Sequence, residues 1–345
     1  MKYAEQGDQY LKIFANCFIT RGVVRSLLVD GYRGLFDFIP NDLCDLLEQA
    51  ETFKLGELYA EYGAENASII DEYLDFLLTK EYAFFITEAE KDCFPALSTE
   101  WRFPGKVANA IIDLGAESHY DVANVLQQLD ELQCIALQIR VFAASSLDWL
   151  ENLLQQCAGL SFENIHLFLP YHASLDEDRL LYLALAYQKI ATIVVHSAPE
   201  TRRVQHEAIN KLAGLLYIEM PITDESHCGV VLPDYFSVNL LHYTESLAAN
   251  SCLNRKISVD RLGNIKNCPS MIESYGHASE VSLKAALETE GFKTKWSIKK
   301  DQIEVCQVCE FRHICTDCRA YLAEPANLYS KPAKCSYDPY VGVWN

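Results

Sequence analysis

The feature that most constrains this chain is a group of seven cysteines that follows residue 250. They follow the order C-x10-G-x4-C, a gap, C-x2-C-x5-C-x2-C, a second gap and a final C, and they are Cys252, Cys268, Cys306, Cys309, Cys315, Cys318 and Cys335. Thiolates are soft ligands, and a two-residue gap lets both sulfurs of a knuckle face one site. The spacing therefore predicts a metal or cluster centre in the C-terminal part.

The residues alone leave the identity of that centre open. Structural zinc ions accept the same sulfurs at similar spacing as iron–sulfur clusters do. Disulfides are not expected, because the total of thirteen cysteines is odd and a cytosolic chain keeps its thiols reduced. The other six are predicted to be small buried apolar residues, and they are Cys17, Cys44, Cys93, Cys134, Cys157 and Cys228.

The charge and hydropathy of the chain exclude several kinds of partner. The formal net charge is -19, so the surface repels phosphate backbones and anionic lipids, and neither nucleic acid nor a membrane is expected as partner. A basic peptide remains compatible with this charge. No apolar run approaches the ~20 residues of a membrane helix, and no apolar segment follows a basic start at the N-terminus. We therefore expect a soluble, cytoplasmic protein.

The sequence lacks the glycine-containing motifs that two common classes of enzyme require. The chain contains no phosphate loop, no G-x-G-x-x-G and no G-x-S-x-G, and it has no pair of adjacent glycines. Nucleotide-binding and serine-hydrolase functions are accordingly not expected.

Residues 10–90 predict a small α+β unit. Two apolar runs, Leu11–Ile19 and Arg25–Asp30, flank a turn at Arg21-Gly22 and suggest a hairpin, with a third run at residues 35–39. Three short helices are expected next, after residue 40, at residues 55–62 and after Asn66, and a strand at residues 82–86 closes the unit. This order resembles a winged helix. Its role is peptide recognition, plain packing or DNA binding, and the acidic third helix argues against DNA.

Residues 106–220 alternate between strand and helix. Strands are expected at residues 107–114, 136–142, 165–169, 190–195 and 215–218, and helices at 121–132, after Ser145 and Ser174 as caps, and near 203–212. Such alternation requires a parallel sheet with helical crossovers. Because only four or five units are present, an open, partial α/β barrel is expected.

The cysteine pattern and its flanking residues resemble the SPASM domain, an auxiliary iron–sulfur domain that usually follows a radical SAM barrel. The segments that carry the resemblance are Asn250–Lys256, Gly263–Pro269 and Cys309–Cys315. They look like the SPASM-domain peptide maturase of grasp-with-SPASM systems, which is encoded with an ATP-grasp ligase and a small precursor peptide. The resemblance implies an α/β chain in three parts: a winged-helix-like precursor-recognition unit (residues 1–100), a partial, open radical-SAM-like α/β barrel (101–225) and a C-terminal SPASM iron–sulfur domain (226–345).

The same resemblance implies two [4Fe–4S] clusters, with zinc as the alternative. One cluster takes Cys306, Cys309, Cys315 and Cys335, and the other takes Cys252, Cys268 and Cys318. Two departures from the family pattern stand out: the last knuckle has two intervening residues in place of three, and a fourth ligand is absent just before Cys252. Cys228 is either that ligand or a buried thiol, and without it one iron stays open. His313 is expected to be a surface or packing residue and not a ligand.

The C-x3-C-x2-C motif that binds the SAM cluster of radical SAM enzymes is absent. After the first barrel strand the sequence reads Gly115–Asp121 without a cysteine, and no other segment has that spacing. Glu117 and His119 are expected to be solvated turn residues. We therefore expect no SAM cofactor and no SAM cleavage.

Two functions remain open. In the first, the chain binds a ribosomally made precursor peptide through residues 10–90 and cooperates with an ATP-grasp ligase. In the second, it is a redox or substrate-binding peptide-modifying enzyme that acts through an open auxiliary cluster. The number of cysteines at the second cluster separates them, because four ligands favour the structural role and three the catalytic one.

Overall fold

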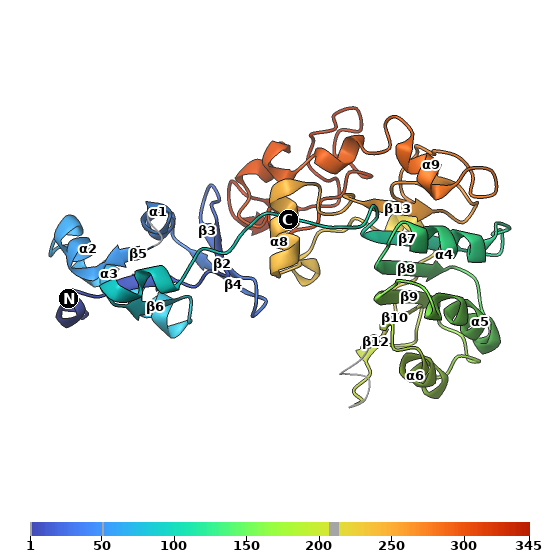
Figure 1. Ribbon diagram of the computed structural model, residues 1–345, viewed down its shortest axis with the longest axis horizontal. Helices are drawn as coiled ribbons and strands as arrows, with labels where there is room; N and C mark the ends of the chain where they lie inside the picture. The colour runs from blue at the N-terminus through green and yellow to red at the C-terminus, as the bar shows by residue number, and fades with distance from the viewer. Residues whose placement is uncertain (1, 50–51, 207–213) are drawn as a thin grey trace.

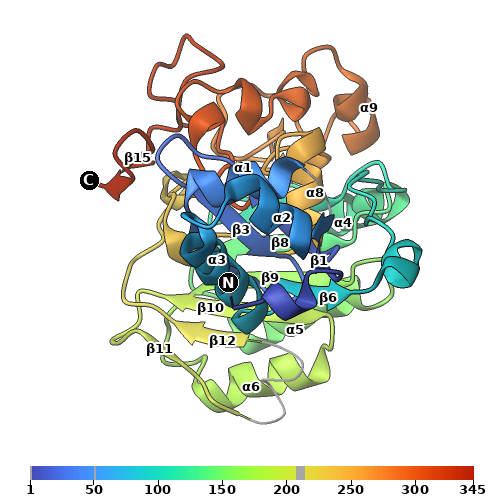
Figure 2. The same cartoon turned by 90° about the vertical axis from the view of Figure 1, so that its left-hand side faces the viewer.

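The computed structural model describes residues 2–49, 52–206 and 214–345. Its ribbon runs through three parts (Figure 1): a small N-terminal unit at one end, a large sheet at the other, and C-terminal loops between them. Figure 2, seen along the long axis, shows the N-terminal unit in front of the sheet and the C-terminal loops along one side of both. No helix among the described residues is long and apolar enough to cross a membrane.

The N-terminal unit contains two antiparallel three-stranded sheets and three helices. One sheet has the order β5-β1-β6 and the other β2-β3-β4. The strands are β1 Tyr10–Ile13, β2 Cys17–Thr20, β3 Ser26–Asp30, β4 Leu35–Ile39, β5 Thr52–Lys54 and β6 Ala83–Ile86. The helices are α1 Asn41–Gln49, α2 Leu55–Tyr62 and α3 Ala67–Thr79. The predicted hairpin, the three helices and the closing strand are confirmed, whereas the winged-helix form stays a prediction.

One predicted strand is wrong. Residues 11–19 form two strands in different sheets, because the chain turns between β1 and β2, where the backbone N–H of Cys17 donates to the carbonyl of Phe14 (2.9 Å). Asn16 holds the turn, since its Nδ2 donates to Oδ1 of Asp30 (2.7 Å). Asparagine favours such turns through local side-chain hydrogen bonds, and an apolar run hides this break.

Strand β3 is buried on both faces and joins two cores. Leu28 packs with the helices of the N-terminal unit. Leu27 and Val29, which point the other way, pack with Phe311 and Ile314 of the C-terminal loops. The β2-β3-β4 sheet is therefore a layer between the N-terminal helices and the cysteine-rich part.

The large sheet has eight strands in the order β11-β12-β10-β9-β8-β7-β13-β14. Neighbours from β12 to β13 are parallel, and β11 and β14 add antiparallel edges. The strands are β7 Asn109–Leu114, β8 Ala136–Val141, β9 Asn164–Pro170, β10 Ile190–His196, β11 Arg202–Arg203, β12 Gly214–Tyr217, β13 Lys256–Val259 and β14 Ile265–Lys266. Helices α4 Val122–Glu131, α5 Leu147–Ala158 and α6 Glu177–Ala186 cross over beside them (Figure 1).

The α/β class and the parallel sheet with helical crossovers are confirmed. The sheet is compatible with a partial barrel, and its radical-SAM-like form stays a prediction. Strand β13 comes from the C-terminal part and pairs with β7, so the sheet runs across residue 225, where the sequence suggested a boundary. The boundaries themselves remain predictions.

Two predicted helix caps are wrong, and the helix expected near residues 203–212 falls largely outside the described residues. Helix α5 is capped by Ser146, whose Oγ accepts from the N–H of Trp149, and not by Ser145. Helix α6 is capped by Asp176 and not by Ser174, because a carboxylate next to the first turn competes better for the free N–H groups. Near residues 203–212, Arg202 and Arg203 form β11, while residues 207–213 lie outside the described part.

The C-terminal part is dominated by loops. Its regular elements are α8 Leu240–Ala248, α9 Leu283–Glu288, β15 Tyr337–Asp338 and β16 Val343–Trp344, besides β13 and β14. Short 3-10 turns occur along the chain at Ala4–Gln6, Glu88–Cys93, Glu225–His227, Pro233–Tyr235, Thr294–Ser297, Lys300–Gln302 and Cys306–Val308. A region with so little regular structure has few backbone ladders to hold it, so cross-links between distant loops matter more for its stability.

Candidate cluster sites

Four cysteines of the C-terminal part gather around one buried lysine. The Nζ of Lys300 donates to the Sγ of Cys315 at 3.1 Å. The charges of Cys306 and Cys315 both raise the pKa of Lys300, and the charge of Cys335 raises the pKa of both thiols. The pKa of Cys309 is raised chiefly by burial, and the charge of Cys315 raises it further. We call these four the first set: Cys306, Cys309, Cys315 and Cys335.

Four further cysteines gather around a second lysine. The Nζ of Lys256 lies 3.5 Å from the Sγ of Cys252. After burial, which is the largest cause, the pKa of Cys252 is raised by the charges of three other thiols. We call these four the second set: Cys228, Cys252, Cys268 and Cys318. The structure thus divides eight cysteines into two groups of four.

Cys228 lies in the second set, although the sequence spacing left its role open. The next residue, Gly229, has a positive φ of 82°, and a Cβ there would stand 2.8 Å from the Sγ of Cys318. Any larger residue would therefore collide with a thiol of the set. The backbone of the segment that carries Cys228 therefore passes close to Cys318.

The β13–β14 hairpin positions two members of the second set. Cys252 precedes β13 and Cys268 follows β14, and β13 is fixed by its parallel pairing with β7. The side chain of Asn250 holds the loop at Cys252, because its Oδ1 accepts from the N–H groups of Cys252 (3.1 Å) and Leu253 (2.9 Å). The second set is therefore built against the end of the large sheet.

The N-terminal unit contacts the loop that carries the first set. Glu310, which is 1% exposed, receives a hydrogen bond from the Nε of Arg25 at 3.0 Å. The backbone N–H of Val23 donates to the carbonyl of Val308 (3.1 Å). A Cβ at Gly22 would lie 2.9 Å from the Cβ of Glu310, so the hairpin packs tightly there. The β2–β3 turn and the Cys306–Cys315 loop form one interface.

Burial controls the charge of both sets. Burial raises the pKa of Cys252 to about 12 and that of Cys306 to about 11, so the free thiols are protonated at neutral pH. Burial alone would lower the pKa of Lys256 and Lys300, but the cysteines, once ionised, raise it above its ordinary value. Because thiols bind metal as thiolates, cluster binding at these sites would release protons.

The donor chemistry of the two sets can be compared with what each kind of centre needs. Each set offers four sulfurs, the full complement for a [4Fe–4S] cluster or for one tetrahedral zinc. No three His, Cys, Asp or Glu side chains within residues 2–49, 52–206 and 214–345 are grouped so as to hold a single metal ion. A single ion needs its ligands to converge on one point, whereas a cubane takes each thiolate at a different iron atom.

Three other residues considered in the sequence lie outside the sets. Glu117 and His119 are exposed in the turn after β7, where Glu117 pairs with Arg261 (3.2 Å), as expected for turn residues. His313 is buried, and its Nδ1 lies 3.2 Å from the Oγ of Ser246, as expected for a packing residue.

Sequence reasoning missed the charged residues that surround the sets. Lys256 and Lys300 carry no signal in the spacing of the cysteines. Asp317 is fully buried between Cys315 and Cys318, where it pairs with the Nη2 of Arg319 at 2.7 Å. In a chain of average composition, a Lys or Asp beside a cysteine reads as a surface residue. Only tertiary packing reveals that these charges are buried together.

A buried ion pair joins the large sheet to the second set. Arg140 of β8 makes two hydrogen bonds of 2.6 Å to the carboxylate of Asp113 on β7. After burial and Asp113, the charges of Cys228 and Cys268 act on the pKa of Arg140 and raise it. The guanidinium thus lies within electrostatic reach of the second set.

Comparison with known proteins finds a loose structural likeness only. No family model matches the sequence, and no curated protein matches it. Among solved structures, the chain is similar to Streptococcus suis SuiB bound to S-adenosylmethionine, with a TM-score of 0.38, 10% identity, and 93% of this chain and 98% of that chain covered. It is also similar to SuiB bound to the precursor peptide SuiA, with a TM-score of 0.34, 9% identity, and 90% and 96% coverage.

Proposed function

We propose that this chain is an iron–sulfur protein that holds two [4Fe–4S] clusters and takes part in the maturation of a ribosomally made peptide. The observation that carries the proposal is the division of eight cysteines into two sets of four, each around its own lysine. The resemblance of the sequence to SPASM maturases supplies the biological setting, and it assigned seven of the same eight residues.

In this proposal the first set holds one cluster and the second set holds the other. When bound, the clusters supply electron transfer and cross-linking of distant loops. With Cys228 as a fourth thiol the second cluster has no open iron, which favours the first of the two functions, a binding and maturation protein. The alternative, catalysis at an open auxiliary cluster, requires a set of three.

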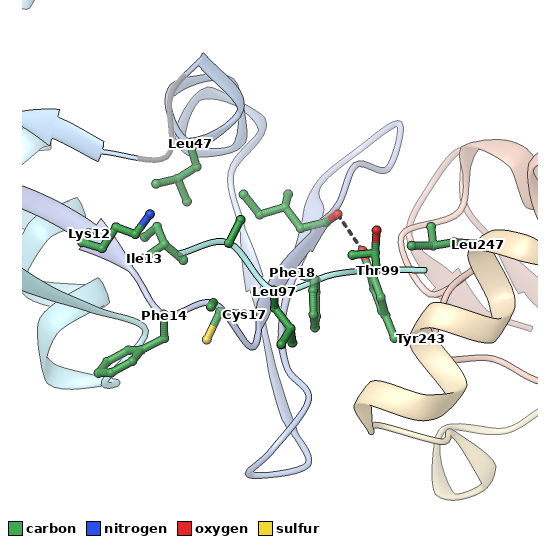
Figure 3. A pocket seen from close by; sticks show the side chains of 13 residues that line it. Lys12, Ile13, Phe14, Cys17, Phe18, Leu47, Leu97, Thr99, Tyr243 and Leu247 are labelled. Carbon is green, nitrogen blue, oxygen red and sulfur yellow. Dashed lines mark hydrogen bonds between the residues drawn. The ribbon is translucent and has the colours of Figure 1, made fainter. Parts of the chain in front are cut away.

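The precursor peptide is proposed to bind at the free edge of β4. The β2-β3-β4 sheet has two edges. At the β2 edge, Tyr243 of α8 donates its hydroxyl to the carbonyl of Ile19 (3.2 Å) and stacks on Phe18. A hollow of about 350 Å³ lies there (Figure 3), closed in by residues 96–99, α1 and α8. Because the β2 edge is partly covered, we propose that the peptide pairs with β4 at the other edge of the sheet.

Strand β4 offers the features that an added strand requires. Leu35 and Phe38 are exposed apolar residues on this edge strand, at 52% and 42% exposure. The end of α3 lies alongside, because Lys80 pairs with Asp37 at 3.0 Å. An extended peptide would gain main-chain hydrogen bonds from the edge and apolar contact from the two side chains.

Charge is a weaker determinant of this recognition than the acidic sequence of α3 suggests. Asp75 accepts a hydrogen bond from the Nζ of Lys2 at 2.6 Å, and Asp71 accepts two from its backbone N–H at 2.9 Å. These carboxylates are already engaged within the chain. The proposal therefore rests on strand pairing, and no preference for a basic peptide is part of it.

Co-expression tests the proposed function. The full chain would be purified anaerobically from cells that also produce the ATP-grasp ligase and the precursor peptide encoded with it. We expect the three to co-purify, and the ligase to modify the peptide faster when the chain is present. Modification at the same rate without this chain, together with no co-purification, would refute the proposal.

A further inference from the structure

In each set of four cysteines, the ammonium group of one lysine lies close to a sulfur. Lys300 is 5% exposed, and its Nζ donates to Cys315 at 3.1 Å. Lys256, on β13, is partly buried, and its Nζ lies 3.5 Å from the Sγ of Cys252. Removing an ammonium from water is costly unless anions lie beside it, so each lysine is matched to the negative charge that its set carries when it is loaded.

Two charged groups near the sulfurs are paired with a charge of opposite sign. Asp317 beside the first set contacts Arg319 (2.7 Å), and Asp113 near the second set is bound by Arg140 (2.6 Å). Glu245, close to Lys256, accepts from the Nδ2 of the neutral Asn254 at 2.9 Å, and burial raises the pKa of its carboxyl. The two ion pairs contribute little net charge at the sulfurs, whereas each lysine contributes a full positive charge.

A positive charge beside a cluster has a defined effect on its electron affinity. A cluster with four thiolate ligands is anionic and gains one further negative charge on one-electron reduction. A fixed cation, and a hydrogen bond to a ligand sulfur, therefore stabilise the reduced form more than the oxidised form and raise the reduction potential. The effect is large where water is excluded, because screening is weak there.

We infer that Lys256 and Lys300 are positioning residues that raise the reduction potentials of two different clusters, Lys256 that of the second set and Lys300 that of the first. This inference rests on the proposed function, since it requires that both sets hold [4Fe–4S] clusters. It assigns to each lysine an effect on one cluster and not on the other, because each contacts a sulfur of its own set.

The test is a redox titration of the full chain, reconstituted anaerobically and followed by EPR of the reduced clusters. The variants are Lys256→Met and Lys300→Met, which remove the charge but keep an unbranched chain. Lys284→Met is the matched control, because Lys284 is exposed on α9. We expect each of the first two variants to lower the reduction potential of one cluster by at least about 59 mV. For one electron, this shift corresponds to a tenfold change in the equilibrium constant of reduction.

The remaining outcomes separate the inference from the proposed function. Lys→Arg at either position should restore most of the potential, since the charge returns. If both Met variants keep the wild-type iron content and the wild-type reduction potentials, the inference is overturned, while the proposal that the chain binds two clusters is unaffected. Loss of one cluster in the Met and Arg variants alike would make the lysine a merely structural residue and would also overturn the inference. Wild-type protein that binds zinc without iron would instead refute the proposed function.

Discussion

At the scale of single residues, Cys228 shows what spacing predicts and what it does not. Only the four cysteines from Cys306 to Cys318 have short gaps throughout, and the resemblance to the SPASM domain joined the other three to them. Cys228 is separated from Cys252 by 23 residues that include α8, and a gap of this length says nothing about distance in space. Gly229 offered a signal, because a glycine after a cysteine is common where a backbone must pass close to a ligand, but the signal is weak by itself. The two lysines had no signal at all.

Replacement of Cys228 by serine is predicted to remove the second cluster selectively. The serine hydroxyl is a poor ligand for iron, so the iron content should fall from about eight to about four atoms per chain. Iron and acid-labile sulfide assays on anaerobically reconstituted protein measure this. Cys157→Ser is the matched control, since Cys157 is buried in the core of the large sheet. Equal iron in the wild type and in Cys228→Ser, together with an unchanged spectrum of the second cluster, would show that Cys228 is only a buried thiol, because three cysteines can also hold a cluster with one open iron.

At the scale of elements, local patterns predicted most strands and helices, and tertiary pairing supplied the rest. The alternation in residues 106–220 identified the parallel strands, because each buried strand reads as an apolar run. The pairing of β13 with β7 was missed, since the two strands are distant in sequence and no local signal records a partner. The break between β1 and β2 was missed for the opposite reason, because apolar residues continue across the turn.

The edge of β4 is predicted to be the peptide site. Leu35→Lys places a charge on the edge strand, and lysine at sheet edges disfavours strand addition. The affinity of the full chain for a synthetic leader of its precursor peptide should fall at least tenfold, as measured by calorimetry or fluorescence anisotropy. Leu185→Lys on α6, at 40% exposure, is the control and should bind normally. Unchanged affinity in Leu35→Lys would place the site elsewhere.

At the scale of the whole molecule, the cysteine-rich part connects the other two. Its first set borders the N-terminal hairpin and its second set borders the large sheet. The sequence suggested three consecutive units, and it contained no sign of the Arg25–Glu310 contact or of the shared core around Phe311. Such contacts depend on surface complementarity between distant segments, which periodicity does not encode.

The contact between Arg25 and Glu310 is predicted to hold the N-terminal unit in place. Arg25→Met leaves a buried carboxylate without its cation, which we expect to cost about 1–3 kcal/mol of unfolding free energy, less than for a fully buried pair because Arg25 is 33% exposed. Chemical denaturation of the loaded protein measures the loss. Arg179→Met, at an exposed pair on α6, should change stability by no more than about 0.5 kcal/mol. Equal stability of the two variants would refute the claim.

The chain is also predicted not to cleave SAM. Reductive cleavage needs a cluster in which three thiolates hold three irons and the fourth iron, free of any thiolate, binds SAM. The turn at Gly115–Asp121 after β7 contains no cysteine. The thiols of the two sets belong to the C-terminal part. Reduced, reconstituted protein incubated with SAM and precursor peptide should form no 5′-deoxyadenosine above a cluster-free control, as measured by chromatography with mass detection. Catalytic 5′-deoxyadenosine would overturn this prediction.

The central claim is that two sets of four cysteines each hold an iron–sulfur cluster. Mössbauer spectroscopy of protein prepared anaerobically with ⁵⁷Fe, combined with metal analysis, tests it most directly. We expect about eight iron atoms and about eight sulfides per chain, in signals of two [4Fe–4S] clusters. Stoichiometric zinc, with no iron after anaerobic reconstitution, would contradict the account.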